Sequence, residues 1–392
     1  MPKSALMRIL SAFSPSTKSI ATWSVVWVGA LVAPVCSSAN DEPAPTKDQT
    51  VVLKQVQTKA IDYLRTKQSD DGSWTSPTAP GISGVMVDAL LRSGLTTADP
   101  TVQKGLKHLE TFIQPDGGIY FAKSNHRNYE TCIAMLAFRE ANTDGRYKQI
   151  LANADKYIRQ QQWDEDEGKN KADLEYGGAG YGSKSRPDLS NTQFLLEALR
   201  AAGAQPSDPA VQKALVFVSR TQNLESEANT TPFSSKINDG GFYYTPAAGG
   251  SSVAGNADNG GLRSYGSMTY AGLKSMIYAG VGPNDPRVKA ANTWIQKHYT
   301  VTENPGLDQT GLFYYHQTFA KTLDAIGSNV VVDANGKEHN WRHELLAQLA
   351  KTQNEDGSWV NKTPRWNEGD PNMATGFSLL ALSYCGQDKA AK

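Results

Sequence analysis

The sequence has little cysteine, no excess of either charge, and no motif with metal-ligand spacing. Only 3 of the 392 residues are cysteine, and no CxxC pair or His/Cys cluster occurs. We therefore expect neither a metal site nor a cofactor. Lys and Arg together number 39, and so do Asp and Glu. This balance gives no global field that would favour nucleic acid or an acidic membrane surface as a partner.

The first 40 residues lack acids but carry three bases, namely Lys3, Arg8 and Lys18. The apolar run "IATWSVVWVGALVAPV" at 20–35 follows, and it is short for a bilayer span. Small residues come next, with Ser37 and Ala39 suited to a signal-peptidase site. The pattern predicts a secretory signal peptide over 1–39, cleaved near Ala39. We therefore expect a secreted or periplasmic protein with no membrane span in the mature chain.

Two other interpretations of this segment stay open. It could remain as an uncleaved N-terminal anchor, or it could be a lipoprotein signal that uses Cys36, although Val35 stands where a small residue is expected. Residues 40–46 are interpreted as a flexible leader and 388–392 as a tail. Export would permit a disulfide between Cys132 and Cys385. Two small, buried apolar side chains are the favoured interpretation.

A heptapeptide occurs near both ends of the chain, as "QSDDGSW" at 68–74 and "QNEDGSW" at 353–359. The stretches between them repeat the Gly-rich turn followed by an aromatic residue. These stretches are "QPDGGIY" (114–120), "EYGGAGYG" (175–182), "NDGGFYY" (238–244) and "DQTGLFYY" (308–315). The regular recurrence of this turn indicates an internal repeat with six copies.

Each turn separates two helical patterns. The stretch before it is amphipathic, with apolar residues recurring at three and four, as in Leu53, Val56 and Ala60. The stretch after it is richer in apolar and small residues and usually closes on glycine, the common residue just past a helix end. Helix starts are predicted where aspartate precedes proline, at Asp99, Asp208 and Asp285.

A polar outer helix, a turn and an apolar inner helix, repeated six times, predict an all-α (α/α)6 toroid. In this double barrel the inner helices form one ring and the outer helices a second ring around it. We expect residues 47–387 to form one domain. The longest insertion, 223–267, is rich in Gly, Ser and Asn and is predicted to be a loop, either a lid or binding loop or a disordered segment.

The repeated turn resembles the QW motif of squalene and oxidosqualene cyclases and the related repeats of protein prenyltransferase β-subunits. The resemblance spans nearly the whole mature chain and would make this protein a divergent, secreted member. In that family the glutamine ties adjacent helix ends together and the aromatic ring stacks over them. The resemblance therefore implies structural roles for Gln68, Trp74, Gln114, Tyr120, Gln353 and Trp359.

The residues that carry out the chemistry of this family are less well matched in this sequence. Class II cyclases protonate their substrate with the middle aspartate of a DxDD motif, and no DxDD occurs in this sequence. The nearest string, "DEDE" at 164–167, reads as a solvated loop. The fourth repeat, "SYGSMTYAG", offers no Asp or Cys for the zinc site of prenyltransferases. A CGEQ thioester stretch is also absent.

The resemblance implies a cavity that opens at the N-termini of the inner helices, so polar and aromatic residues there are candidates. His316 could act as acid, base or ligand, and Asp308 or Glu130 could be a relocated acid. Glu130 could also pair with His126. The expected ligand cavity is lined by His126, Tyr129, Tyr265, Met268, Tyr314, Tyr315 and Trp366. Each of these residues could equally be ordinary barrel core, helix cap or surface.

Several functions remain open. The protein is expected to bind a small hydrophobic or polymeric ligand in its central cavity, without the cyclase acid or the zinc site. Alternatively, it is a divergent terpenoid cyclase-type enzyme, an isomerase or transferase, or a polysaccharide-active enzyme on the same fold. A protein-interaction module has no positive support in the sequence.

Overall fold

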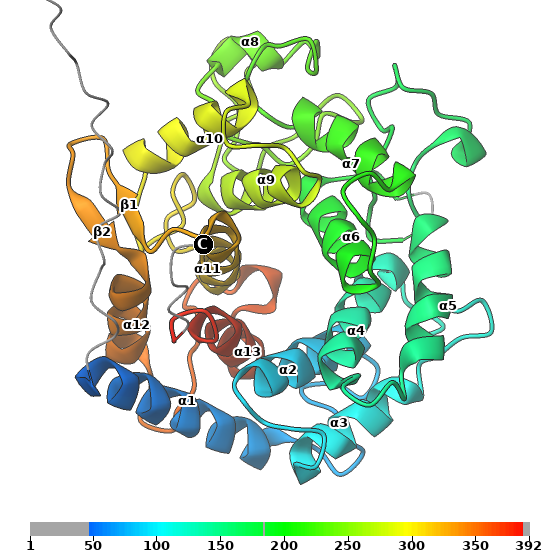
Figure 1. The fold of residues 1–392 in the computed structure, drawn as a ribbon, viewed down its shortest axis with the longest axis vertical. Helices are drawn as coiled ribbons and strands as arrows, with labels where there is room; N and C mark the ends of the chain where they lie inside the picture. Colours follow the sequence, from blue (N-terminus) through cyan, green and yellow to red (C-terminus); the bar gives the residue numbers. More distant parts are fainter. Residues whose placement is uncertain (1–46, 183–184, 387–392) are drawn as a thin grey trace, which may run out of the picture. The chain divides into compact units, whose positions relative to one another are not determined.

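Outer and inner helices alternate along the chain, as the repeat predicts. The computed structural model describes residues 47–182 and 185–386, which lie in the compact unit Pro43–Lys392. In this part of the chain, six helices surround the centre of the ring and six lie outside them (Figure 1). The inner helices are α2 (Pro80–Arg92), α4 (Arg127–Ala141), α6 (Leu189–Ala201), α9 (Gly266–Tyr278), α11 (Leu312–Ile326) and α13 (Pro371–Leu382). The outer helices are α1 (Lys47–Lys67), α3 (Pro100–Glu110), α5 (Lys148–Arg159), α7 (Pro209–Arg220), α10 (Pro286–Lys297) and α12 (Trp341–Thr352).

This arrangement confirms the (α/α)6 toroid. The predicted signal peptide, Cys36, the leader and the tail fall outside the described residues. Among the described residues, no helix is long and apolar enough to cross a bilayer. Cys132 and Cys385 are both buried and free, as two small apolar side chains would be.

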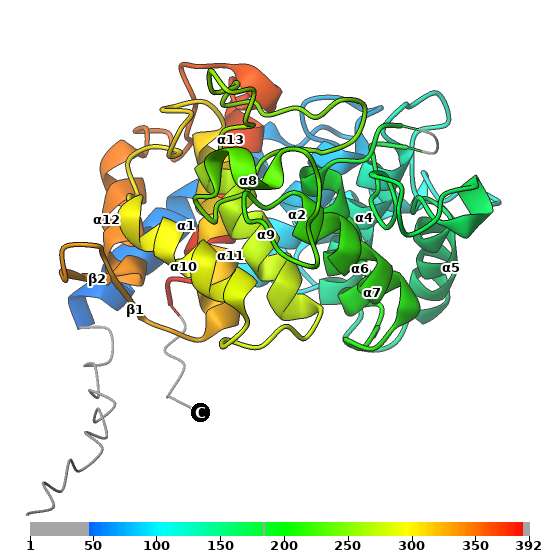
Figure 2. The same cartoon turned by 90° about the horizontal axis from the view of Figure 1, so that it is seen from above.

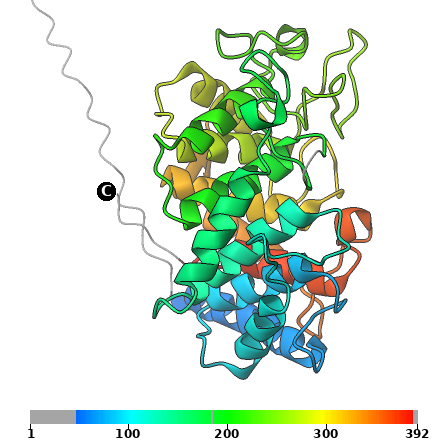
Figure 3. The same cartoon turned by 90° about the vertical axis from the view of Figure 1, so that its right-hand side faces the viewer.

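The two ends of the ring differ in their connections. The longer connections run from outer to inner helices and gather at one end, as Figure 2 and Figure 3 show from two sides. We call this end the N-terminal rim, because the inner helices begin there. The inner helices finish at the opposite end, the C-terminal rim, where shorter connections lead to the next outer helix.

The insertion at 223–267 is largely irregular, as expected, and is held down by its own contacts. It contains the one-turn helix α8 (Ser234–Ile237). The side-chain amide of Asn223 donates to the carbonyl of Leu262 at 2.6 Å, and Phe242 is fully buried. Two short 3-10 turns, η1 (Glu165–Glu167) and η2 (Arg365–Asn367), lie in other connections.

A small hairpin between α11 and α12 is a regular element that the helical repeat does not predict. Its strands, β1 (Val330–Val332) and β2 (Glu338–Asn340), pair antiparallel, with Val331 opposite His339. The pairing is only three residues long, so the chain keeps its all-α character.

In the first repeat, the glutamine and the tryptophan of the turn donate to backbone carbonyls of the turn and of the adjacent outer helices. The amide of Gln68 donates to the Gly72 carbonyl in its own turn and to the Thr101 carbonyl in α3, at 3.1 and 3.0 Å. Trp74 is fully buried, and its ring N–H donates to the Leu64 carbonyl at 2.8 Å. The first turn is thereby fastened to the next outer helix.

Two further glutamines also join a turn to the next outer helix. Gln162 donates to the carbonyls of Gly177 and Ala210, and Gln222 donates to those of Gly240 and Arg287, all at 2.9 Å. Both follow an outer helix, but insertions separate them from their glycines. The heptapeptide spacing therefore does not reveal them.

The second repeat departs from the expected register by one residue. The turn places Gln114 where the first repeat has Ser69, because Gly117 donates to the Gln114 carbonyl as Gly72 does to that of Ser69. Ile113 and Ile119 thus stand in place of the glutamine and the tryptophan. The Gln114 amide reaches only the carbonyls of Phe112 and Tyr120 in its own turn. Gln114 therefore does not tie this turn to the next outer helix.

The predicted helix caps are confirmed. Asp99, Asp208 and Asp285 each accept a hydrogen bond from a backbone N–H of the first turn that follows, and proline occupies the first helical position. Arg159 of α5 also pairs with Asp208 at 2.8 Å, so the cap joins consecutive outer helices.

Candidate ligand site

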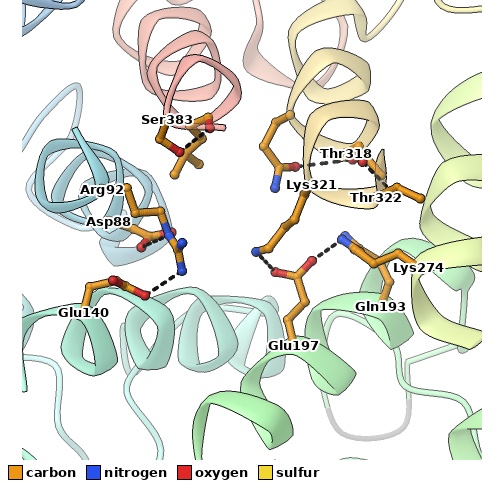
Figure 4. A network of polar contacts seen from close by, with 12 residues as sticks. Asp88, Arg92, Glu140, Gln193, Glu197, Lys274, Thr318, Lys321, Thr322 and Ser383 are labelled. Carbon is orange, nitrogen blue, oxygen red and sulfur yellow. Dashed lines mark hydrogen bonds and ion pairs between the residues drawn. The ribbon is translucent and has the colours of Figure 1, made fainter. Parts of the chain in front are cut away.

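A triad of charged side chains lies inside the inner ring. Glu197 of α6 forms ion pairs with Lys274 of α9 and Lys321 of α11 (Figure 4). Lys274 and Glu197 are essentially inaccessible to solvent, and Lys321 is 8% exposed. Full burial of lysine and glutamate is rare in proteins unless the charges are paired.

Helix geometry brings the three residues together. Each lies four or five residues before the last residue of its helix, so the three reach a similar depth in the ring. The Lys274 ammonium also donates to the side-chain carbonyl of Gln193, one turn before Glu197 on α6. The triad is therefore built from three adjacent inner helices.

The electrostatics of the triad depend on burial and on the shared carboxylate. Burial alone would raise the pKa of Glu197, but the attraction of Lys274 and Lys321 outweighs it and lowers that pKa to about 2. Burial lowers the pKa of Lys274 to about 8, despite the opposing attraction of Glu197. For Lys321 burial acts in the same direction, yet Glu197 prevails and raises the pKa. Glu197 is thus an ionised carboxylate at neutral pH.

A second ion cluster stands beside the triad. Arg92 of α2 pairs with Asp88 on its own helix at 2.9 Å and with Glu140 of α4 at 2.6 Å (Figure 4). Both acids raise the pKa of Arg92 against the effect of burial, so this base stays charged.

The pocket at the C-terminal rim opens onto these clusters. It has two adjoining lobes of about 430 and 380 Å³, which share Arg92, Arg200, Tyr278 and Lys321. The larger lobe is also lined by Leu136, Arg139, Glu140, Asn142, Thr143, Glu197 and Ala201. The smaller lobe adds Ile277, Asp324, Ala325 and Tyr384. This pocket is large enough for a small organic molecule.

Polar contacts continue from the triad toward the N-terminal rim. The amide nitrogen of Gln193 donates to the Tyr314 hydroxyl at 3.2 Å, and that hydroxyl lies 3.0 Å from the hydroxyl of Ser190. Aromatic rings surround this chain, because Phe194 contacts both Tyr129 and Tyr314, with ring centroids 5.4 and 6.2 Å apart. Aromatic side chains therefore occupy the inner ring on that side.

A buried acid lies at the N-terminal rim. Asp188 caps α6, accepting from the backbone N–H and the side-chain amide of Asn191, both at 2.8 Å. The Tyr244 hydroxyl also hydrogen-bonds to it. Burial raises the pKa of Asp188 to about 6, and these hydrogen bonds only partly offset that rise.

The structure places His316 in a packed, solvent-inaccessible position on α11. Its Nε2 lies 2.8 Å from the Val301 carbonyl, which can only accept, so Nε2 carries the proton. Nδ1 is buried without a hydrogen-bond partner. Burial lowers the pKa of His316 to about 4. The ring is therefore neutral near pH 7, and it lines neither lobe of the pocket.

The other candidate acids lie apart from one another. Asp308 is exposed at a turn with φ 51°. Glu130 is buried, accepts from the Phe121 N–H and the Ser124 hydroxyl at 3.0 and 2.7 Å, and has its pKa raised by burial. His126 is exposed and contacts Tyr181 instead, with ring centroids 4.9 Å apart. The catalytic roles of these residues stay predictions.

The predicted cavity residues differ in burial. Tyr265, Met268 and Tyr315 are buried in side-chain packing, and the Tyr315 hydroxyl donates to the Thr300 carbonyl at 2.7 Å. Tyr129 and Tyr314 are only partly buried and share Phe194 as a neighbour. Trp366 is 39% exposed and stands against Gly311 at the start of α11.

The residues of the triad were not singled out from the sequence, although a signal exists. Glu197, Lys274 and Lys321 interrupt stretches that are otherwise apolar or small: "FLLEAL", "YAGLKSM" and "FAKTL". Charges at matching positions of inner helices indicate a polar layer in the ring. Within residues 47–182 and 185–386, no three His, Cys, Asp or Glu side chains are placed to hold a metal ion.

Comparisons with known proteins agree with this architecture. The family model of the squalene-hopene cyclase C-terminal domain matches residues 75–245. The unliganded structure of the type II terpene cyclase MstE from Scytonema has a TM-score of 0.52 at 12% identity, over 86% of this chain and 98% of that chain. At such low identity the likeness concerns the fold alone. A search of curated proteins gives no match.

Two MstE variants with bound molecules were also matched. The complex with the product merosterolic acid A covers 87% of this chain and 99% of its own at 12% identity. The complex with the substrate geranylgeranyl dihydroxybenzoate covers 86% and 99% at 13% identity. Their TM-scores of 0.30 add no support. The family-model match and the shared toroid agree with the resemblance to squalene cyclase and terpenoid cyclase toroids.

Proposed function

We infer that this protein is an exported binding protein that holds a small organic ligand in the pocket at its C-terminal rim, without cyclase acid chemistry. The observation that carries the proposal is the triad of Glu197, Lys274 and Lys321, of which Glu197 and Lys321 line that pocket. An acid that protonates an alkene needs a proton to give, whereas Glu197 is held ionised between two ammonium groups.

The pocket has the mixed lining that ligand sites share. Leu136, Ala201 and the Tyr278 ring supply apolar contact, while the charged groups of Arg92 and Lys321 can orient a polar end. Export is supported by the basic start, apolar run and small residues of positions 1–39. N-terminal sequencing of the protein recovered outside the cytoplasm would test it, with a start near Asn40 expected.

The binding proposal is tested by screening the purified protein for thermal stabilisation by a panel of small acids, amines, sugars and terpenoids. Ligands that bind the native state raise its melting temperature with concentration. We expect at least one class to do so, and we expect Arg200→Glu, at the mouth of the pocket, to abolish the effect. A ligand whose stabilising effect persists in Arg200→Glu but disappears in Tyr129→Ala would place binding at the other rim and contradict the proposal.

A second candidate function is acid catalysis of the terpenoid-cyclase type at the N-terminal rim. The observation in its favour is Asp188, a buried carboxyl among tyrosines, whose raised pKa of about 6 keeps it protonated in mildly acidic solution. The test is incubation with squalene and with geranylgeranyl dihydroxybenzoate, the substrate bound by an MstE variant, followed by product analysis. A cyclised product that disappears in Asp188→Asn would favour this candidate over the binding protein.

A further inference from the structure

The buried triad is unbalanced in charge. One carboxylate, Glu197, serves two ammonium groups, Lys274 and Lys321, and all three side chains are at least nine-tenths buried. A buried charge without a counter-ion is costly, because the protein interior solvates it far less than water does. With both lysines protonated, the triad taken alone carries one surplus positive charge.

The neighbouring acids offset the charge of the triad. Asp88 and Glu140 share the single positive charge of Arg92, so that cluster carries one surplus negative charge, and Asp324 pairs with Arg342 at 3.0 Å. The Arg200 side chain at the mouth of the pocket donates to the Tyr278 carbonyl at 3.2 Å. The lining of the two lobes still holds more bases than acids: Arg92, Arg139, Arg200 and Lys321 against Glu140, Glu197 and Asp324. The surplus of positive charge therefore lies in the lining of the pocket.

The helix ends at this rim do not replace a counter-ion. The inner helices finish here, and each helix end carries a partial negative charge of roughly half a unit. That charge is spread around the ring and shared with every base nearby. A discrete anion in the pocket would instead meet Lys321 directly, since Lys321 lines both lobes.

We propose that the pocket binds a small organic acid, with its carboxylate or phosphate against Lys321 between Arg92 and Arg200 and its apolar part on Leu136 and Tyr278. This inference rests on the proposed binding function and adds the chemical class of the ligand. The anion offsets the surplus positive charge of the lining, and both arginines can offer it paired N–H donors.

The charge balance predicts how binding depends on pH. Burial brings the pKa of Lys274 to about 8, so its charge, and the attraction it adds for an anion, declines as pH rises past that value. The tyrosines and the cysteine that face the triad have pKa values raised by burial, which leaves them neutral through pH 9. The facing groups are Asp88, Arg92, Cys132, Arg200, Tyr278, Tyr314 and Tyr384. Affinity for an anion should therefore fall between pH 7 and pH 9.

Three probes of matched shape separate charge from hydrophobic contact: hexanoate, hexylamine and hexanamide. Inorganic phosphate, as a fourth probe, tests whether the anion alone suffices. Titration calorimetry of the purified protein at pH 7 should show saturable binding of hexanoate, and binding at least about tenfold weaker for the amine and the amide. Phosphate that binds as tightly as hexanoate would indicate a phosphate-bearing ligand; much weaker phosphate binding would indicate a carboxylic acid. Either result is consistent with the proposal.

The variants connect the binding to the triad. Lys321→Met leaves Glu197 and Lys274 as a balanced pair, and it should weaken hexanoate binding by about tenfold or more. Arg200→Gln, at the exposed mouth, serves if Lys321→Met does not fold. Arg263→Gln, an exposed arginine on the opposite rim, is the matched control and should leave binding unchanged.

Two results would overturn the inference. The first is equal or tighter binding of hexylamine or hexanamide that is lost in Arg200→Gln. That result keeps the proposed binding function and rejects the anion. The second is absence of saturable hexanoate binding, or hexanoate binding that Lys321→Met and Arg200→Gln leave unchanged. The panel of unrelated ligands described above tests the binding function separately.

Discussion

The side-chain amide of Gln353 donates to the backbone carbonyl of Val56, 3.0 Å away and 297 positions earlier in the chain. This hydrogen bond joins the turn of the last repeat to the first outer helix, α1. The same amide donates to the Gly357 carbonyl in its own turn. Gln353 thus closes the ring in the way that Gln68 joins the first repeat to the second.

Replacing this glutamine should loosen the closure. We expect Gln353→Ala to cost about 1–3 kcal/mol of unfolding free energy, because two buried carbonyls lose their donor. Hydrogen exchange should quicken in α1 and α12 together. Gln114→Ala is the matched control, since that amide bonds only within its own turn, and its effect should stay near 112–120. Faster exchange in α1 from Gln114→Ala alone would contradict this role.

Glycine in the repeated turn should be required for two reasons, which a pair of alanine variants separates. Gly72 has φ +88°, and a Cβ there would lie 2.2 Å from the Lys104 carbonyl oxygen of α3. Gly94 has φ +96° with nothing within 4 Å. Gly94→Ala should cost about 1–2 kcal/mol from the left-handed backbone alone. Gly72→Ala should cost clearly more in urea unfolding, and equal losses would show that the contact with α3 is unimportant.

Replacing the acid of the triad and replacing one of its bases should have different effects on the free energy of unfolding. Glu197→Gln leaves two buried ammonium groups facing each other and should cost about 3–5 kcal/mol at pH 7. Lys321→Met leaves one balanced pair and should be neutral or stabilising. Denaturant unfolding of both variants measures the contrast. If Lys321→Met destabilised the protein as much as Glu197→Gln, the triad would not carry a surplus charge.

Asp188 should make the protein less stable as pH rises. Its pKa is about 6 in the folded state, above the usual 3.8, so the folded protein binds more protons between these values. The stability that its proton provides is complete below pH 4 and is lost as pH rises through 6. The free energy of unfolding falls by about 3 kcal/mol by pH 7, because the folded and the usual pKa of Asp188 differ by roughly two.

Asp188→Asn should therefore stabilise the protein at pH 7 and change little at pH 4. Asparagine still caps a helix, and the buried, unpaired Oδ1 of Asn191 can accept from it after a flip of that amide. Asp208→Asn is the control: it also caps a helix, but Arg159 lowers the pKa of Asp208. That variant should lose stability at pH 7. Urea unfolding at both pH values tests the contrast, and a matching response of the two variants would contradict it.

The fold was predictable because the same local signals recur at corresponding positions of successive repeats. Aspartate–proline starts, such as Asp208 with Pro209, and glycine after the inner helices repeat around the chain. The hairpin at 330–340 has no counterpart in other repeats, so periodicity does not indicate it. The one-residue shift at Gln114 is a matter of turn geometry and shows only in its hydrogen bonds.

The site was less predictable for a physical reason. The pattern of an inner helix requires only that most residues be apolar or small. A single charged residue in such a stretch, such as Lys274 or Glu197, leaves that pattern recognisable. Their significance depends on three helices that are distant in sequence meeting at one depth. The sequence pointed to the N-terminal rim, where Tyr129 and Tyr314 both contact Phe194, whereas the pocket lined by Glu197 and Lys321 opens at the other end.

A crystal structure of the protein with hexanoate tests the central claim most directly. We expect the carboxylate within about 3 Å of the Lys321 ammonium, a charge-assisted hydrogen-bond distance, and the alkyl chain against Leu136 and Tyr278. Hexanoate bound at the N-terminal rim between Tyr129 and Tyr314, with the pocket beside Lys321 holding none, would contradict it.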